Sequence, residues 1–152
     1  MKKLLLAVIV SLSTISTAAL AEIKVGIILG FTGPIESLTP AMRDGAKLAF
    51  QEASDSGNLL GGETFTILEA DSTCVDAAAA TAAAEGLVAD GVAAIMGADC
   101  SGVTKAINAS VAVPNGILMV SPSATSPALS KVPDAGTFWR TAPSDAKGGQ
   151  IL

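Results

Sequence analysis

The chain has 152 residues, of which 50% are hydrophobic and 3% aromatic, and its formal net charge is −5. An acidic chain with one Trp, no Tyr and four Phe lacks the basic surface and the stacking platforms that nucleic-acid binding requires. A chain without His lacks the commonest general base and the usual zinc ligand. We therefore expect one domain with a hydrophobic core, and no nucleic-acid partner, metal or cofactor.

The first 21 residues have the pattern of a secretory signal peptide. Met1-Lys2-Lys3 is positively charged, residues 4–15 are mostly apolar, and Ala19-Leu20-Ala21 is a cleavage site of the A-x-A type. A membrane anchor is the alternative, but the apolar run is shorter than the roughly 20 residues that a membrane span needs. The pattern predicts export to a bacterial periplasm, with Glu22 as the first mature residue.

The first part of the mature chain alternates between strand and helix patterns. The apolar run 23–29 is rich in β-branched residues and predicts a strand buried on both faces. Thr39 and Pro40 are typical of an N-cap and a first helical residue, and we expect their helix to end at Gly57. A turn at 58–62 and a second strand at 64–70 follow.

The second part repeats the alternation. An Ala-rich helix is predicted from Asp76 to about Asp90, with Gly91 as its C-cap, because Ala has the highest helix propensity. The remaining predictions are a strand at 92–96, a helix from Ser101 to about Val111, a turn at 114–116, strands at 117–120 and 137–140, and a helix capped by Ser144.

This order of elements predicts an α/β fold with a parallel sheet, right-handed crossovers and helices on both faces. Ligands of such sheets bind beyond the carboxyl ends of the strands. Two loops expected there are rich in hydroxyl groups, Cys100-Ser101-Gly102-Val103-Thr104 and Ser121-Pro122-Ser123-Ala124-Thr125-Ser126. Because a turn from a strand into a helix offers free N–H groups, we expect these two turns to form half of a site for a small zwitterion.

Each turn also has a simpler interpretation. Ser101 could be an ordinary helix N-cap, and residues 123–125 could be an ordinary polar loop.

Catalysis is disfavoured, because residues 99–103 lack the first glycine of Gly-x-Ser-x-Gly and no His is present to activate a serine. The glycines after the first strand do not match a dinucleotide-binding or phosphate-binding loop. The sequence thus favours a binding protein over an enzyme.

Cys74 and Cys100 are the only two cysteines. An oxidising compartment favours a disulfide between them, and two separate buried thiols are the alternative. If the cysteines pair, loop closure would stabilise the fold by about 3–4 kcal/mol.

Several short segments stand in the order found in a known family. They are Gly30-x-Thr32-Gly33-Pro34, Arg43-Asp44-Gly45-x-x-Leu48-Ala49, Asp71-x-x-Cys74, Gly97-x-x-Cys100-Ser101-Gly102 and the run from Ile117 to Thr125. In these segments the chain resembles the Leu/Ile/Val-binding proteins, which are type I periplasmic substrate-binding proteins of branched-chain amino acid ABC importers. The resemblance covers residues 22–152.

This family has two α/β lobes with the ligand between them. With residues 1–21 as the signal peptide, the resemblance implies that residues 22–139 are the N-terminal lobe. It implies that residues 140–152 are the first crossover and the truncated start of the second lobe.

The resemblance also implies how a ligand is held. The α-carboxylate would be bound by Ser101 and by the N–H of Thr125. The ammonium group would be met by the carbonyl of Ser123 and the hydroxyl of Thr125. An aromatic wall of the family falls here on Leu38, and a position that is often apolar is Asp99, which would favour a polar or amide ligand.

The implied function is that of a periplasmic solute-binding component of an ABC importer. It would bind an amino acid (branched-chain or related), an amide or a urea-like compound, and deliver it to a permease in the inner membrane. The alternatives are an exported α/β serine-type enzyme and an extracellular ligand-sensing domain.

Overall fold

A computed structural model describes residues 22–151, so the predicted signal peptide lies outside the described residues. Five parallel strands form one sheet in the order β2-β1-β3-β4-β5, which confirms the predicted α/β class. The strands are β1 (Glu22–Leu29), β2 (Thr64–Asp71), β3 (Ala94–Gly97), β4 (Leu118–Ser121) and β5 (Phe138–Arg140).

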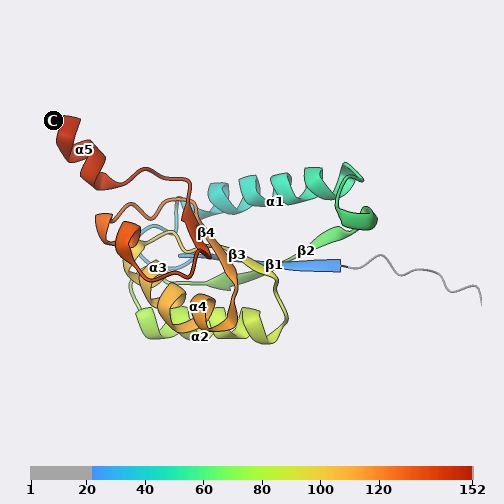
Figure 1. Cartoon of the computed structure of the whole chain (residues 1–152), viewed down its shortest axis with the longest axis horizontal. Helices are drawn as coiled ribbons and strands as arrows, with labels where there is room; N and C mark the ends of the chain where they lie inside the picture. Colours follow the sequence, from blue (N-terminus) through green and yellow to red (C-terminus); the bar gives the residue numbers. More distant parts are fainter. Residues whose placement is uncertain (1–21, 152) are drawn as a thin grey trace, which may run out of the picture.

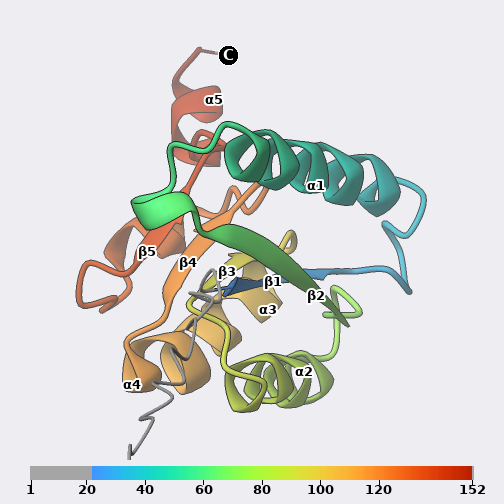
Figure 2. The same cartoon turned by 90° about the vertical axis from the view of Figure 1, so that its right-hand side faces the viewer.

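Helices cover both faces of the sheet, as predicted. The α-helices are α1 (Thr39–Asp55), α2 (Ala77–Ala89), α3 (Ser101–Ile107), α4 (Val113–Asn115) and α5 (Asp145–Ile151). The short 3-10 helices η1 (Leu60–Gly62) and η3 (Pro127–Lys131) and the π-helix η2 (Asn108–Ala112) complete the set. In Figures 1 and 2, α1 lies on one side of the sheet and α2, α3 and α4 lie on the other.

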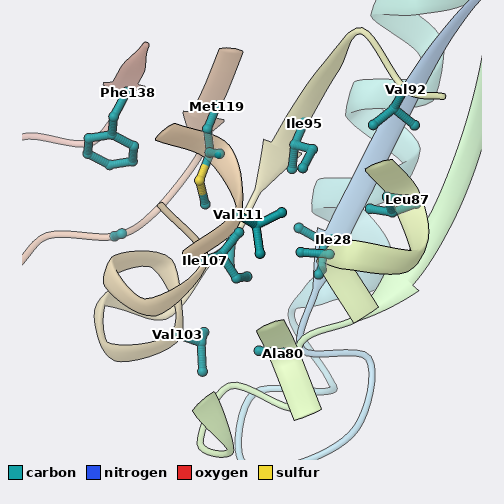
Figure 3. Packing of buried hydrophobic residues seen from close by; sticks show 14 of the residues in the cluster. Ile28, Ala80, Leu87, Val92, Ile95, Val103, Ile107, Val111, Met119 and Phe138 are labelled. Carbon is teal, nitrogen blue, oxygen red and sulfur yellow. The ribbon is translucent and has the colours of Figure 1, made fainter. Parts of the chain in front are cut away.

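The main hydrophobic core lies on the side of α2, α3 and α4. It is built from alternate residues of the strands, which share one face because side chains alternate along a strand. Ile28, Ile95 and Met119 are at most 1% exposed and pack against Ile107 and Val111 of the helical layer (Figure 3).

The side of α1 is covered less completely. Met96, Val120 and Trp139 are partners in the register of β3, β4 and β5, so they share this face. A hollow of about 270 Å³ lies between α1 and these strands, lined by Ala46, Ala49, Phe50, Met96, Val120, Pro122 and Thr141. Trp139 is 63% exposed. This hollow follows the face of the sheet and meets the second serine-rich turn only at Pro122.

Two predicted helix ends differ from the structure. The residue at the N-cap of α1 is Leu38 rather than Thr39, because the buried Thr39 hydroxyl contacts the carbonyls of Gly30 and Glu36 instead of capping the helix. The turn predicted at 114–116 is confined to Gly116, because α3 continues through η2 and α4 to Asn115. Pro114 has no N–H for the carbonyl four residues earlier, and the wider π turn before it accommodates that gap.

None of the helices within residues 22–151 is long and apolar enough to cross a membrane.

Candidate functional site

The start of α3 presents backbone N–H groups that no side chain of its N-cap residue occupies. Cys100 is the N-cap residue, and its side chain makes no capping hydrogen bond. Ser101 is the first residue of the helix, so its interpretation as an ordinary N-cap is wrong. By contrast, α2 begins at a filled cap, where Asp76 accepts the N–H groups of Ala78 and Ala79. The start of α3, unlike the start of α2, therefore has free N–H groups that suit an external anion.

The structure brings the two serine-rich turns together. Ser101 Oγ accepts a hydrogen bond of 3.1 Å from the N–H of Ser126. Ser123 Oγ donates a hydrogen bond of 3.1 Å to the carbonyl of Asp99. Because Ser101 accepts in its contact with Ser126, its hydroxyl hydrogen stays available to donate to another group.

Thr125 lies in the second turn, held on both sides by Arg140. The guanidinium Nη1 donates to the carbonyl of Ala124 at 3.2 Å and to the carbonyl of Ser126 at 2.9 Å. Nη2 of the same side chain donates to Ser130 Oγ at 2.6 Å. Sequence reasoning placed Arg140 at the end of the fifth strand and the start of the first crossover, and no motif around it signalled that it fixes this turn.

Leu38 lies before the first turn of α1 and is 56% exposed. Met42 follows it by four residues, so the two side chains share one face of the helix. The Sδ atom of Met42 is 4.0 Å from Ser123 Oγ. The first turn of α1 therefore borders the second serine-rich turn, with Leu38 at its exposed end. Met42 was not singled out from the sequence, where it only matched the helical apolar spacing.

Cys74 and Cys100 form a disulfide, which overturns the alternative of two separate thiols. Their Cα atoms are 5.2 Å apart, and the bond joins the loop after β2 to the N-cap residue of α3. The disulfide thus anchors the residue that directly precedes Ser101.

Asp71 fixes the loop after β1, which sequence reasoning did not predict. Its carboxylate accepts the hydroxyl of Thr32 at 2.5 Å, and also the N–H groups of Thr32 and Thr73. Partial burial acts to raise the pKa of Asp71, but these hydrogen bonds, with one from the N–H of Phe31, outweigh it and hold the pKa below its ordinary value.

Asp99 lies at the centre of the loops rather than at their surface. It is 3% exposed, and both of its carboxylate oxygens accept hydrogen bonds from protein groups. A direct contact with a ligand would require these bonds to open.

Within residues 22–151, the hydrogen bonds of the two turns suit binding, and none of them activates Ser101 as a nucleophile. The described partner of Ser101 Oγ is a backbone N–H, which is a donor and cannot accept the serine proton. An uncapped helix start, a hydroxyl and a rigid turn instead form the kind of site that holds a carboxylate through fixed dipoles.

The sequence profile described as "Periplasmic binding protein" matches residues 22–150. The chain belongs to this family.

Curated relatives support the assignment to this family. The Leu/Ile/Val-binding protein BraC3 of Rhizobium johnstonii is 33% identical over 129 residues, which cover 85% of this chain and 34% of the relative. A Leu/Ile/Val-binding protein homolog 1 of Brucella abortus is 36% identical over 135 residues, which cover 88% of this chain and 35% of the relative. The chain thus spans about a third of the length of these relatives.

Solved structures share the fold. The branched-chain amino acid transporter substrate-binding protein LivJ of Streptococcus pneumoniae, in complex with isoleucine, superposes with a TM-score of 0.74 at 28% identity. That match covers 83% of this chain and 35% of LivJ. An ABC transporter substrate-binding protein of Desulfitobacterium hafniense, in complex with Leu, gives a TM-score of 0.72 at 28% identity and covers 87% of this chain and 37% of the other. These relatives are solute-binding proteins and not enzymes.

Proposed function

We propose that residues 22–139 form the first lobe of a periplasmic solute-binding component of an ABC importer. In this proposal the ligand is an amino acid, branched-chain or related, which is carried to a permease in the inner membrane. The observation that carries the proposal is the uncapped start of α3 beside the second serine-rich turn. The ligand class is supported by the similar solved structures, which include proteins in complex with isoleucine and Leu.

In this site the ligand carboxylate lies at the start of α3. It accepts the hydroxyl hydrogen of Ser101 and the N–H of Thr125. The ammonium group lies against the carbonyl of Ser123 and the hydroxyl of Thr125, and Leu38 forms part of the wall around the side chain. Matched donors and acceptors let the site desolvate a zwitterion without leaving either charge unpaired.

A one-lobe surface leaves the far side of the ligand in solvent. We propose that the second lobe, with an acidic group for the ammonium, closes over it, and that residues from 140 onward begin the crossover to that lobe. The driving force for closure is the set of contacts that the ligand makes only in the closed state.

The test is calorimetric titration of the complete gene product with a panel of amino acids and amides. The panel contains Leu, Ile and Val, polar amino acids, and simple amides and urea as the polar alternatives. We expect saturable heat with at least one aliphatic amino acid and a rise in the unfolding temperature. A protein that gives no heat with any member of the panel would contradict the proposal, and heat with amides alone would move the ligand to that class.

A further inference from the structure

The side chain and backbone of Asp99 connect the loops that follow four strands. Oδ2 accepts the N–H of Gly30 at 2.7 Å, and Oδ1 accepts the hydroxyl of Ser72 at 3.2 Å and the N–H of Cys100 at 2.9 Å. The Asp99 carbonyl accepts the hydroxyl of Ser123 at 3.1 Å. Gly30 follows β1, Ser72 follows β2, Asp99 itself follows β3, and Ser123 follows β4. One residue thus links all four loops at this edge of the sheet.

The surroundings of the carboxylate are closed. Asp99 is 3% exposed and Ser72 is 0% exposed. A Cβ atom added to Gly30 would lie 3.3 Å from Asp99 Oδ2 and 3.1 Å from Cys74 Cβ, so the backbone of the first loop fills the space beside the carboxylate. A ligand at the surface does not reach these oxygens while the loops keep this arrangement.

We propose that Asp99 is a positioning residue for ligand binding, which fixes the start of α3 relative to the other loops without touching the ligand. This inference rests on the proposed function. Its bond to the N–H of Cys100 fixes the N-cap residue, from which Ser101 and the free N–H groups of α3 continue. Its bonds to Gly30 and Ser72 tie that N-cap to the loops that carry Leu38 and the disulfide. The role differs from that expected from the sequence, in which Asp99 selected the ligand directly.

Positioning and direct contact change affinity in different ways. A residue that holds the site in shape affects every amino-acid ligand alike, since all amino acids use the carboxylate end of the pocket. A residue that touches the ligand side chain changes the order of preference between aliphatic, polar and amide ligands. The decisive measurement is therefore the dissociation constant across a panel rather than for one ligand.

The experiment compares three substitutions in the complete gene product. Asp99→Leu keeps the branch at Cγ in a larger side chain, removes every side-chain acceptor and leaves the three donors of Gly30, Ser72 and Cys100 unpaired. In Asp99→Asn the amide oxygen still accepts, but its NH2 group faces the Gly30 N–H, donor against donor. Ser72→Ala removes one partner without changing Asp99. Asp55→Asn, at the exposed end of α1, is the matched control.

Affinities are measured by calorimetry at a temperature well below the unfolding midpoint of each variant. We expect Asp99→Leu to weaken all ligands by about tenfold or more, Asp99→Asn by less, and Ser72→Ala by about threefold. The ratio of affinities between ligands should stay within about twofold of the wild type in all variants. Asp55→Asn should match the wild type.

Two results would overturn the inference. A lowered unfolding temperature with unchanged dissociation constants would make Asp99 a stabilising residue only. A changed order of ligand preference would make it a ligand contact. If Asp99→Leu does not fold, Ser72→Ala and Asp99→Asn still decide between these outcomes.

A second readout needs no ligand and separates this inference from the proposed function. In the ligand-free protein, Asp99→Asn should speed amide hydrogen exchange at Gly30 and shift the NMR resonances of Ser101 and Gly102, while α2 stays unchanged. Unchanged exchange and resonances would overturn the positioning role even in a protein that binds. A wild type that binds nothing would refute the proposed function, whatever these amides show.

Discussion

The hydroxyl oxygen of Ser101 accepts a hydrogen bond of 3.1 Å from the N–H of Ser126, 25 residues later in the chain. This contact joins the loop after β3 to the loop after β4 and leaves the Ser101 hydroxyl hydrogen available to donate to a ligand. The two turns therefore form one surface, and a substitution at Ser101 alters the conformation of both turns.

Replacing Ser101 by Ala should weaken ligand binding in the complete gene product by about 1–3 kcal/mol, because a hydrogen bond to a charged carboxylate is lost. Ser110→Ala is the matched control, since Ser110 is exposed on η2 away from the turns. Calorimetric titration of both variants checks the prediction. Equal affinities for the wild type and Ser101→Ala would remove Ser101 from the site.

Replacing Arg140 by Met should loosen the second turn. Met is also unbranched, but it cannot donate the three hydrogen bonds that Arg140 makes. We expect a loss of about 1–3 kcal/mol in the free energy of unfolding, measured by urea denaturation. Ligand affinity should fall as well, since Thr125 lies between the two carbonyls that Arg140 holds. Arg140→Lys should recover only part of both effects, because one ammonium nitrogen cannot make both the carbonyl contacts of Nη1 and the contact of Nη2 with Ser130 Oγ. An Arg140→Lys variant as stable as the wild type would contradict the role of the fork.

Breaking the disulfide should destabilise the protein by about 3.5 kcal/mol, given the 26-residue separation of Cys74 and Cys100. Urea denaturation with and without a thiol reductant measures this difference. The double variant Cys74→Ala/Cys100→Ala should be as unstable as the reduced wild type and should not respond to reductant. A wild-type midpoint that is insensitive to reductant would show that the disulfide contributes no stability.

Asp71 should make stability dependent on acid pH. Its folded pKa lies below the ordinary value of 3.8, so its ionised form stabilises the fold above that value, and the contribution is lost as pH falls through the folded pKa. Asp71→Asn should therefore be less stable than the wild type at pH 7, by about 1 kcal/mol for a partly exposed group. The difference should shrink below pH 4 in urea denaturation series. A difference that is constant from pH 7 to pH 3 would assign the effect to something other than the charge of Asp71.

The sequence predicted the secondary structure well where local signals were strong. The β-branched run of β1 and the Ala-rich α2 lie within two residues of their predicted bounds, because burial and helix propensity act on each segment by itself. The continuation of α3 to Asn115 was missed, because Pro114 and Gly116 are ordinary turn signals and nothing in the sequence marks a π turn before a proline.

The candidate site was predicted only in part. The meeting of the two serine-rich turns follows from parallel topology alone, which places successive strand ends at one edge of the sheet. The partners of Arg140 and Asp99 depend on loop conformation, and a lone Arg or Asp in sequence carries no sign of which carbonyl or N–H it meets. Asp99 was expected from the sequence to favour a polar or amide ligand, whereas its bonds to Gly30 and Ser72 place its carboxylate among buried loop groups.

Trp139 is the only tryptophan of the chain and lies on the less covered side of the sheet, in register with Val120 and 63% exposed. Its indole is therefore a built-in optical probe of that surface. Residues 22–151 alone should emit at the long wavelength of a hydrated indole, and quenching by iodide should be efficient. Any part of a longer polypeptide that covers β4 and β5 would shift the emission to shorter wavelength and protect it from the quencher. A single fluorescence spectrum thus reports whether this side of the sheet is open or covered.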